Sequence, residues 1–227
     1  MPIGSGRGQS SLDYNVDLVM CIDATASMSP IIEEVKKNAK QFYKKFAEEM
    51  DRAEKSVQQF RIKVIVFRDY GCDSEPMVES KFFELDQEQE AFNEFVQNIE
   101  AIGGGDEPEN SLEALALAMK SDWTKEGAVQ RHIIMLYTDA SALELGERKE
   151  SPLYPTDIPK SIGELREWWE GQYMNRRAQR LLLFAPDSNP WPSCADWANT
   201  FHIASKAGAG CDDTDIDTCI NLLVKSI

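Results

Sequence analysis

The chain has 227 residues, with 24 Lys and Arg residues against 39 Asp and Glu residues, and a formal net charge of −15 at pH 7. This charge argues against electrostatic binding to nucleic acid or to an anionic membrane, because both require a positive protein surface. It is compatible with binding cations. A composition of 42% hydrophobic and 28% charged residues is that of a soluble globular protein, and no stretch approaches the roughly eighteen apolar residues of a membrane span.

The start of the chain and its cysteines indicate the compartment. MPIGSGRGQSS is rich in glycine and serine and lacks the apolar stretch of a secretory signal, so we expect a flexible tail at 1–11 and a single domain at 12–227. Five cysteines are scattered without CxxC spacing, which favours reduced structural thiols over disulfides or a thiolate metal site. We therefore expect a cytoplasmic protein.

The first predicted element is a strand at 16–23, VDLVMCID, a nearly continuous apolar run typical of a strand buried on both faces. Ser29-Pro30 marks a helix start, and apolar residues then recur at three- and four-residue steps through 31–50. The next predicted elements are a strand at 61–70, a short edge strand at 80–85 and a helix at 86–102.

The glycine-rich segment GGGDEPEN at 103–110 ends that helix, and another helix is predicted at 111–123. A third buried strand, RHIIMLYTD at 131–139, again ends in an acid. SIGE at 161–164 has the pattern of a capping box that opens a helix stopped at Gly171. The remaining predicted elements are strands at 180–187 and 200–204 and a closing helix at 213–227.

Strands alternating with helices predict an α/β fold with a doubly wound, Rossmann-like central sheet. We expect this sheet to be mostly parallel, with one short antiparallel edge strand and helices on both faces. Ligands of such folds bind outside the carboxyl ends of the parallel strands. Following the chain direction brings three segments to that end: DATAS at 23–27, GGGDEPE at 103–109 and TDAS at 138–141.

These three segments gather carboxylate and hydroxyl oxygens, without thiolate or imidazole. Hard oxygen donors suit Mg²⁺, Mn²⁺ or Ca²⁺ rather than zinc or copper. Carboxylates this close would repel one another and raise their pKa values unless a cation lay between them. The polar residues of the cluster are Asp23, Thr25, Ser27, Asp106, Glu107, Glu109, Thr138 and Asp139.

The same three segments carry a resemblance to a known family. IDATASM at 22–28 resembles the D-x-S/T-x-S motif in the metal-ion-dependent adhesion site of von Willebrand factor type A domains. LYTDAS at 136–141 is similar to the Thr-Asp at the end of a later strand in that family, and GGGDEPEN resembles its glycine loop. The three motifs occur in order and on matching elements, and the resemblance covers about residues 13–227.

The resemblance implies a non-enzymatic protein-interaction module that binds a six-coordinate divalent cation, Mg²⁺ before Mn²⁺ or Ca²⁺. The hydroxyls of Thr25 and Ser27 would hold the ion, with Asp23 and Asp139 binding directly or through water. The sixth position would stay open for an acidic side chain of a protein partner.

This chain departs from the family in its glycine loop, which in most members contributes a Thr ligand and here has none. Asp106 is the predicted substitute, with Ser111 behind it. An acid there would tighten the metal and make it less electrophilic towards a partner carboxylate. FRDYGCD at 67–73 together with GGGDEPEN also resembles intracellular and bacterial members, including those associated with tellurium resistance and kinase–phosphatase signalling.

Four residues are candidates for an interface rim around the ion: Asp69, Glu107, Glu109 and Trp191. Asp69 could instead form an internal ion pair with Arg68, and Trp191 could instead pack in the core. The long connection 140–160 is a further candidate wall, expected to be mobile because it exceeds the usual loop length.

Two other functions stay open. One is a metal-dependent phosphohydrolase or phosphotransferase of the aspartyl-phosphate type, resembling haloacid dehalogenases. Such a site needs a second Asp where this chain has Thr25, and a Lys to neutralise phosphate. The other is a structural domain with a vestigial metal site, because the glycine loop lacks its Thr. Catalysis by a Ser/His or Cys/His pair is not expected, since neither histidine is placed at the ligand end.

Overall fold

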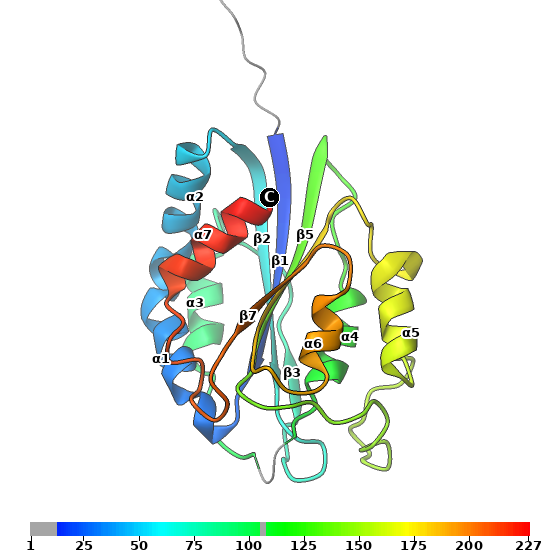
Figure 1. Ribbon diagram of the computed structural model, residues 1–227. Coiled ribbons are helices and arrows are strands. Elements are labelled where there is room, and N and C mark those ends of the chain that lie inside the picture. Colours follow the sequence, from blue (N-terminus) through cyan, green and yellow to red (C-terminus); the bar gives the residue numbers. More distant parts are fainter. Residues whose placement is uncertain (1–12, 105–107) are drawn as a thin grey trace, which may run out of the picture.

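The computed structural model describes residues 13–104 and 108–227, and within these residues seven strands form one sheet (Figure 1). The strands are β1 (Asp13–Asp23), β2 (Ser56–Phe67), β3 (Met77–Glu79), β4 (Phe83–Glu84), β5 (Val129–Tyr137), β6 (Gln179–Ala185) and β7 (Thr200–Ala204). Their spatial order is β3-β2-β1-β5-β6-β7, and β4 also pairs with β2. The five longer strands pair in parallel, whereas β3 and β4 run antiparallel to β2. The predicted fold class is confirmed, while the predicted tail at 1–11 lies outside the described residues.

Helices cover both faces of the sheet, as Figure 1 shows. The helices are α1 (Ser29–Asn38), α2 (Phe42–Arg52), α3 (Gln89–Gln97), α4 (Ser111–Met119), α5 (Ile162–Glu167), α6 (Trp191–Ala195) and α7 (Ile216–Ser226). Helices α1, α2, α3 and α7 lie on one face and α4, α5 and α6 on the other. Among these helices, none combines the length and apolar character needed to cross a lipid bilayer.

The position of β1 at the centre of the sheet explains why apolar and polar residues do not alternate along the run at 16–23. Side chains of a strand point alternately to the two faces of its sheet. Leu18 and Met20 pack into the core beneath α1, α2 and α7, whereas Val19 and Cys21 pack into the core beneath α4 and α6. Because both faces are covered by helices, burying this strand requires apolar residues at nearly every position.

The sheet edge and one helix differ from prediction. The single edge strand expected at 80–85 is replaced by two short strands, β3 and β4. Between them the Val64 N–H donates to the Ser80 hydroxyl at 2.9 Å instead of to a backbone carbonyl, while the Ser80 N–H still donates to the Val64 carbonyl at 2.9 Å. The helix expected at 31–50 is divided by a 3₁₀ turn at 39–41. Helix α6 was not predicted, since its segment Trp191–Ala195 is only five residues long and contains a proline.

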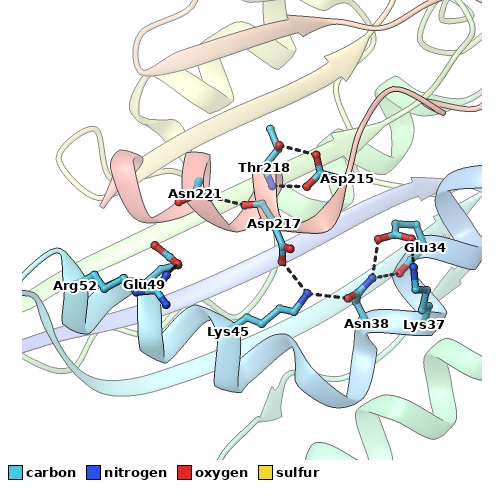
Figure 2. A network of polar contacts seen from close by, with 10 residues as sticks. All are labelled: Glu34, Lys37, Asn38, Lys45, Glu49, Arg52, Asp215, Asp217, Thr218 and Asn221. Carbon is cyan, nitrogen blue, oxygen red and sulfur yellow. Dashed lines mark hydrogen bonds and ion pairs between the residues drawn. The ribbon is translucent and has the colours of Figure 1, made fainter.

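Polar contacts join α7 to α2, as Figure 2 shows. The Lys45 ammonium on α2 donates to Asp217 Oδ1 at 2.7 Å and to Asn38 Oδ1 at 3.0 Å. Asp215 caps α7 by accepting from the Thr218 N–H at 2.8 Å. Surface contacts of this kind contribute only about 0–1 kcal/mol each, so the apolar face of α7 supplies most of its attachment to the sheet.

Candidate metal centre

Asp23 is the last residue of β1, and its carboxylate is completely buried. Its Oδ1 accepts hydrogen bonds from the Thr25 N–H at 3.0 Å and the Thr25 hydroxyl at 2.7 Å. Its Oδ2 accepts from the Thr138 hydroxyl at 2.8 Å. Asp23 therefore orients one hydroxyl from its own loop and one from the end of β5.

A second link joins Ser27 to Asp139, which lie 112 residues apart in the chain. The Ser27 hydroxyl donates to Asp139 Oδ1 at 3.0 Å, and it lies 3.4 Å from the Thr25 hydroxyl oxygen. Because each hydroxyl can give its proton to a carboxylate, its lone pairs stay available to a cation. The structure thus brings together all four ligands that the first and third motifs predict.

The loop that precedes α7 holds the other side of Asp139. The Gly210 N–H donates to Asp139 Oδ2 at 2.7 Å, and the Gly208 N–H donates to the Asp139 backbone carbonyl at 3.0 Å. Gly210 has a φ of +62°, and a Cβ there would lie 2.2 Å from the Ser27 carbonyl oxygen. Only glycine fits this position without moving the backbone that carries Ser27.

Burial controls the electrostatics of the cluster. It raises the pKa of Asp23 to about 6; the negative charge of Asp139 acts in the same direction, and the hydrogen bonds from Thr25 and Thr138 oppose it. The ionised form of a buried carboxylate is costly unless a positive charge lies beside it. A cation at this end of the sheet would offset that cost.

Arg68 anchors the beginning of the glycine loop. Its guanidinium donates to the carbonyls of Ala24 at 3.2 Å and Ile102 at 3.1 Å, and so joins the loop after β1 to the glycine segment. A Cβ on Gly104 would lie 2.8 Å from Thr25 Cβ, so this glycine packs directly against a predicted ligand. The predicted ligand Asp106 and the rim candidate Glu107 lie outside the described residues. Ser111 is buried at the start of α4, and its hydroxyl has no hydrogen-bond partner within the described part of the chain.

The three rim candidates among the described residues are buried, which does not fit an outer rim. Trp191 is 0% exposed and donates its indole N–H to the Ala140 carbonyl at 2.9 Å, so it supports the loop after β5 from inside the core. Asp69 is 1% exposed and forms a two-pronged ion pair with Arg148, at 2.9 and 3.1 Å, rather than with its neighbour Arg68. Glu109, the remaining described candidate, is 3% exposed and also does not form an outer rim.

Side-chain contacts join the connection 140–160 to neighbouring elements at two places. Arg148 lies in this segment and holds Asp69 in the loop after β2. Tyr154 donates to Glu113 Oε1 in the first turn of α4 at 2.6 Å, accepts from the Gly146 N–H at 2.7 Å and packs on the Tyr70 ring. We call this segment the strap. It thus contacts the loop after β2 and the first turn of α4.

The donor set fits a hard divalent cation. Thr25 and Ser27 offer neutral oxygens, and Asp23 and Asp139 offer anionic ones, which is the ligand chemistry preferred by Mg²⁺ and its relatives. In 13–104 and 108–227, no group of three or more His, Cys, Asp or Glu side chains forms a metal cluster. Any ion at this site would therefore depend on the two hydroxyls as well as on the carboxylates.

Comparisons with known proteins identify the family of the fold. A sequence profile of the von Willebrand factor A domain matches residues 17–150, more than half of the chain, and the chain belongs to this family. No curated protein matches it in overall sequence. The narrower resemblance to tellurium-resistance proteins stays a prediction.

Solved structures support the same fold. The pilus adhesin SpaC from Lactobacillus rhamnosus GG is similar with a TM-score of 0.57 at 12% identity, over 93% of this chain and 30% of that one. A von Willebrand factor type A protein from Catenulispora acidiphila is similar with a TM-score of 0.55 at 16% identity, over 93% of this chain and 42% of that one. At these identities the likeness shows the fold alone, and this chain spans less than half the length of either protein.

Sequence reasoning missed the side chains that support the site from a distance. Arg68 was considered only as a partner of Asp69, and Arg148 was not singled out. No local pattern identifies their roles, because Arg148 and Asp69 are 79 residues apart in the chain. The GAG sequence at 208–210 was a usable signal, since glycines in a loop after a strand can mark a close backbone approach.

Proposed function

We propose that this chain is a non-enzymatic protein-interaction module that binds a divalent cation, Mg²⁺ before Mn²⁺ or Ca²⁺, and through it an acidic side chain of a protein partner. The observation that carries the proposal is the convergence of Asp23, Thr25, Ser27 and Asp139 at the carboxyl ends of β1 and β5. Membership of the von Willebrand factor A family supports an interaction role.

Within this proposal, each residue has a defined task. Thr25 and Ser27 present neutral oxygens to the ion, while Asp23 and Asp139 keep those hydroxyls oriented and supply negative charge. The bound ion supplies a positive centre that a partner carboxylate can approach. Two neutral donors keep the total ligand charge low, which leaves the ion able to accept an outside anion.

The geometry of Asp23 disfavours the aspartyl-phosphate alternative. An attacking carboxylate needs an exposed oxygen, whereas Asp23 is 0% exposed and both of its oxygens accept hydrogen bonds within the fold. We therefore expect no turnover of an aryl phosphate with Mg²⁺. Turnover that disappears in Asp23→Asn would favour the enzyme instead.

Metal binding is tested by calorimetric titration of Mg²⁺ and Mn²⁺ into the native chain and three variants. We expect Ser27→Ala and Asp139→Asn to weaken binding by roughly tenfold or more, since each loses one direct donor or its orienting partner. Ser29→Ala is the matched control, because Ser29 is a nearby exposed serine at the start of α1. Native protein that binds neither ion would refute the proposal and favour a vestigial site.

Partner binding is tested with the immobilised chain in Mg²⁺ or in EDTA, followed by replacement of acidic residues on the captured protein. The proposal requires that capture falls in EDTA and in Ser27→Ala, and that one partner acid accounts for it. Capture that is equal in Mg²⁺ and EDTA would show that the metal is not the bridge.

A further inference from the structure

The two edges of the sheet differ in how well they are protected against pairing with another strand. At one edge, β3 is three residues long and carries Glu79, which forms an ion pair with Lys63 at 2.7 Å. Short strands and charged side chains discourage pairing of an edge with another chain. At the other edge, β7 is five residues long, contains no Asp, Glu, Lys or Arg, and pairs on its outer side with no other strand of the described residues (Figure 1).

The hydrogen bonds between β6 and β7 show which backbone groups of β7 face outwards. The Leu181 N–H of β6 donates to the Asn199 carbonyl at 3.0 Å, so Asn199 directs its carbonyl towards β6. The backbone groups of successive residues in a strand point to opposite sides, so the next residue and every second residue after it direct their N–H and carbonyl groups away from β6. These outward-facing residues are Thr200, His202 and Ala204.

The side chains along this edge are uncharged, and opposite charges lie beyond its two ends. Phe201 is 49% exposed, and it lies on the same face of the sheet as Ile203, two residues further along the strand. The exposed residues Asp196 and Lys206 lie before and after the strand. The edge of β7 is therefore an apolar, uncharged surface in a chain whose net charge is −15.

We propose that β7 is a self-association edge, at which a second copy of this chain pairs antiparallel about a two-fold axis at His202. In this register, Thr200 of one copy lies opposite Ala204 of the other, and every outward-facing residue exchanges both backbone hydrogen bonds with its counterpart. Phe201 lies opposite Ile203 of the second copy, where side chains of an antiparallel pair approach most closely, so its exposed ring becomes covered.

The charges beyond the strand favour the antiparallel arrangement. It brings the Asp196 end of each copy to the Lys206 end of the other, whereas a parallel arrangement would place like charges together. Because pairing uses the free edge of each copy, assembly stops at two copies. A strand of five residues gives a small interface, so the dissociation constant is expected to be roughly micromolar or higher.

This inference goes beyond the proposed function and does not depend on a bound metal. Strand β7 runs parallel to β6, β5 and β1. Antiparallel pairing of two copies therefore points their two candidate ion sites in opposite directions. A dimer of this kind would present two binding ends, and so would join two partner molecules.

Sedimentation velocity in EDTA, from micromolar to submillimolar concentrations, tests the dimer. We expect the native chain to shift from monomer to dimer as its concentration rises. Phe201→Lys should weaken the association by at least roughly tenfold, because it places a charge on the apolar edge. The matched control is Leu153→Lys, which places the same charge on an exposed apolar residue of the strap and should leave the association unchanged.

Cysteine cross-linking tests the register in a Cys72→Ser background, because Cys72 is exposed and the other cysteines are buried. In the proposed register the two copies of His202 face each other with Cα atoms about 5.5 Å apart, which a disulfide can span. The two copies of Thr200 are separated by about 13 Å along the strands, which a disulfide cannot span. We expect His202→Cys to form at least roughly tenfold more covalent dimer than Thr200→Cys. Circular dichroism establishes that each variant is folded.

The outcomes separate this edge from other surfaces. A native chain that stays monomeric at submillimolar concentration overturns the inference and leaves the edge free for a strand of another protein. A dimer that is equally strong in Phe201→Lys and Leu153→Lys also overturns it, because the association then uses another surface. Cross-linking at Thr200 that equals or exceeds cross-linking at His202 would contradict the two-fold antiparallel register. Metal binding is measured separately, so the proposed function stands or falls independently of these results.

Discussion

Replacing Asp23 by Asn should stabilise the metal-free protein, although it removes a residue at the centre of the candidate site. Burial raises the pKa of Asp23 from 3.8 to about 6. At about 1.4 kcal/mol for each pH unit, the ionised carboxylate costs the fold about 3 kcal/mol at neutral pH. Asn has nearly the same shape and no charge, so it avoids this cost.

The hydrogen bonds around Asp23 reduce the expected gain. An Asn side chain can still accept from the Thr25 hydroxyl, but its amide would face the Thr138 hydroxyl, which now donates to Asp23 at 2.8 Å. Turning the Thr138 hydroxyl into an acceptor costs about 1 kcal/mol. A net gain of about 2 kcal/mol then remains, which corresponds to about 4–8 °C in melting temperature for a domain of this size.

The assay is thermal melting in EDTA at several pH values, with Asp86→Asn as a control that removes an exposed carboxylate of equal charge. Because the folded state holds the Asp23 proton more tightly than the unfolded state, native stability rises as pH falls from about 6 to about 4. The advantage of Asp23→Asn should therefore be full at pH 7 and vanish near pH 4. Saturating Mg²⁺ should reverse the order, since only the native chain gains binding energy. A variant that melts below the native protein in EDTA at pH 7 would refute the argument.

Three further changes test the supports of the site. Trp191→Ala should destabilise the fold by about 3–5 kcal/mol in urea unfolding, because it empties a fully buried site and leaves the Ala140 carbonyl unpaired, whereas a loss below about 1 kcal/mol would argue against a core role. Gly210→Ala should lower the free energy of unfolding by more than about 1 kcal/mol and also weaken Mg²⁺ binding, because its Cβ would lie 2.2 Å from the Ser27 carbonyl oxygen. Gly146→Ala is the control, because Gly146 also has a positive φ but a Cβ there would meet open space. Arg148→Met should lower the free energy of unfolding by about 2–4 kcal/mol, because buried Asp69 loses its ion-pair partner. In a double-mutant cycle, the double variant with Asp69→Asn should recover part of this loss.

The sequence predicted best those features that follow from local composition. VDLVMCID and RHIIMLYTD are apolar on both faces of the sheet, so their burial and pairing follow from pattern alone, and both strands end in an acid at the same edge. Counting chain directions then placed Asp23 and Asp139 together, because parallel strands share their carboxyl ends.

The sequence predictions failed where contacts between distant parts of the chain determine the position of a side chain. Trp191 follows a proline in a segment whose sequence is typical of a loop, and its indole N–H donates to a carbonyl 51 residues earlier in the chain. Asp69 is paired with a strap residue instead of its neighbour, since Arg68 is occupied by backbone carbonyls. Glu109 was predicted at the interface rim, whereas it is 3% exposed and its backbone pairs with Ala142.

The strap is attached to the rest of the protein through two of its residues. Arg148 and Tyr154 bind side chains outside the strap, whereas Leu153, which lies between them, is 55% exposed and does not pack into the core. Residues between the two anchors can therefore vary in identity with little effect on the strands below. A recognition sequence could therefore be exchanged between Arg148 and Tyr154, and new binding specificities could be engineered there without changing the candidate ion site at the end of the sheet.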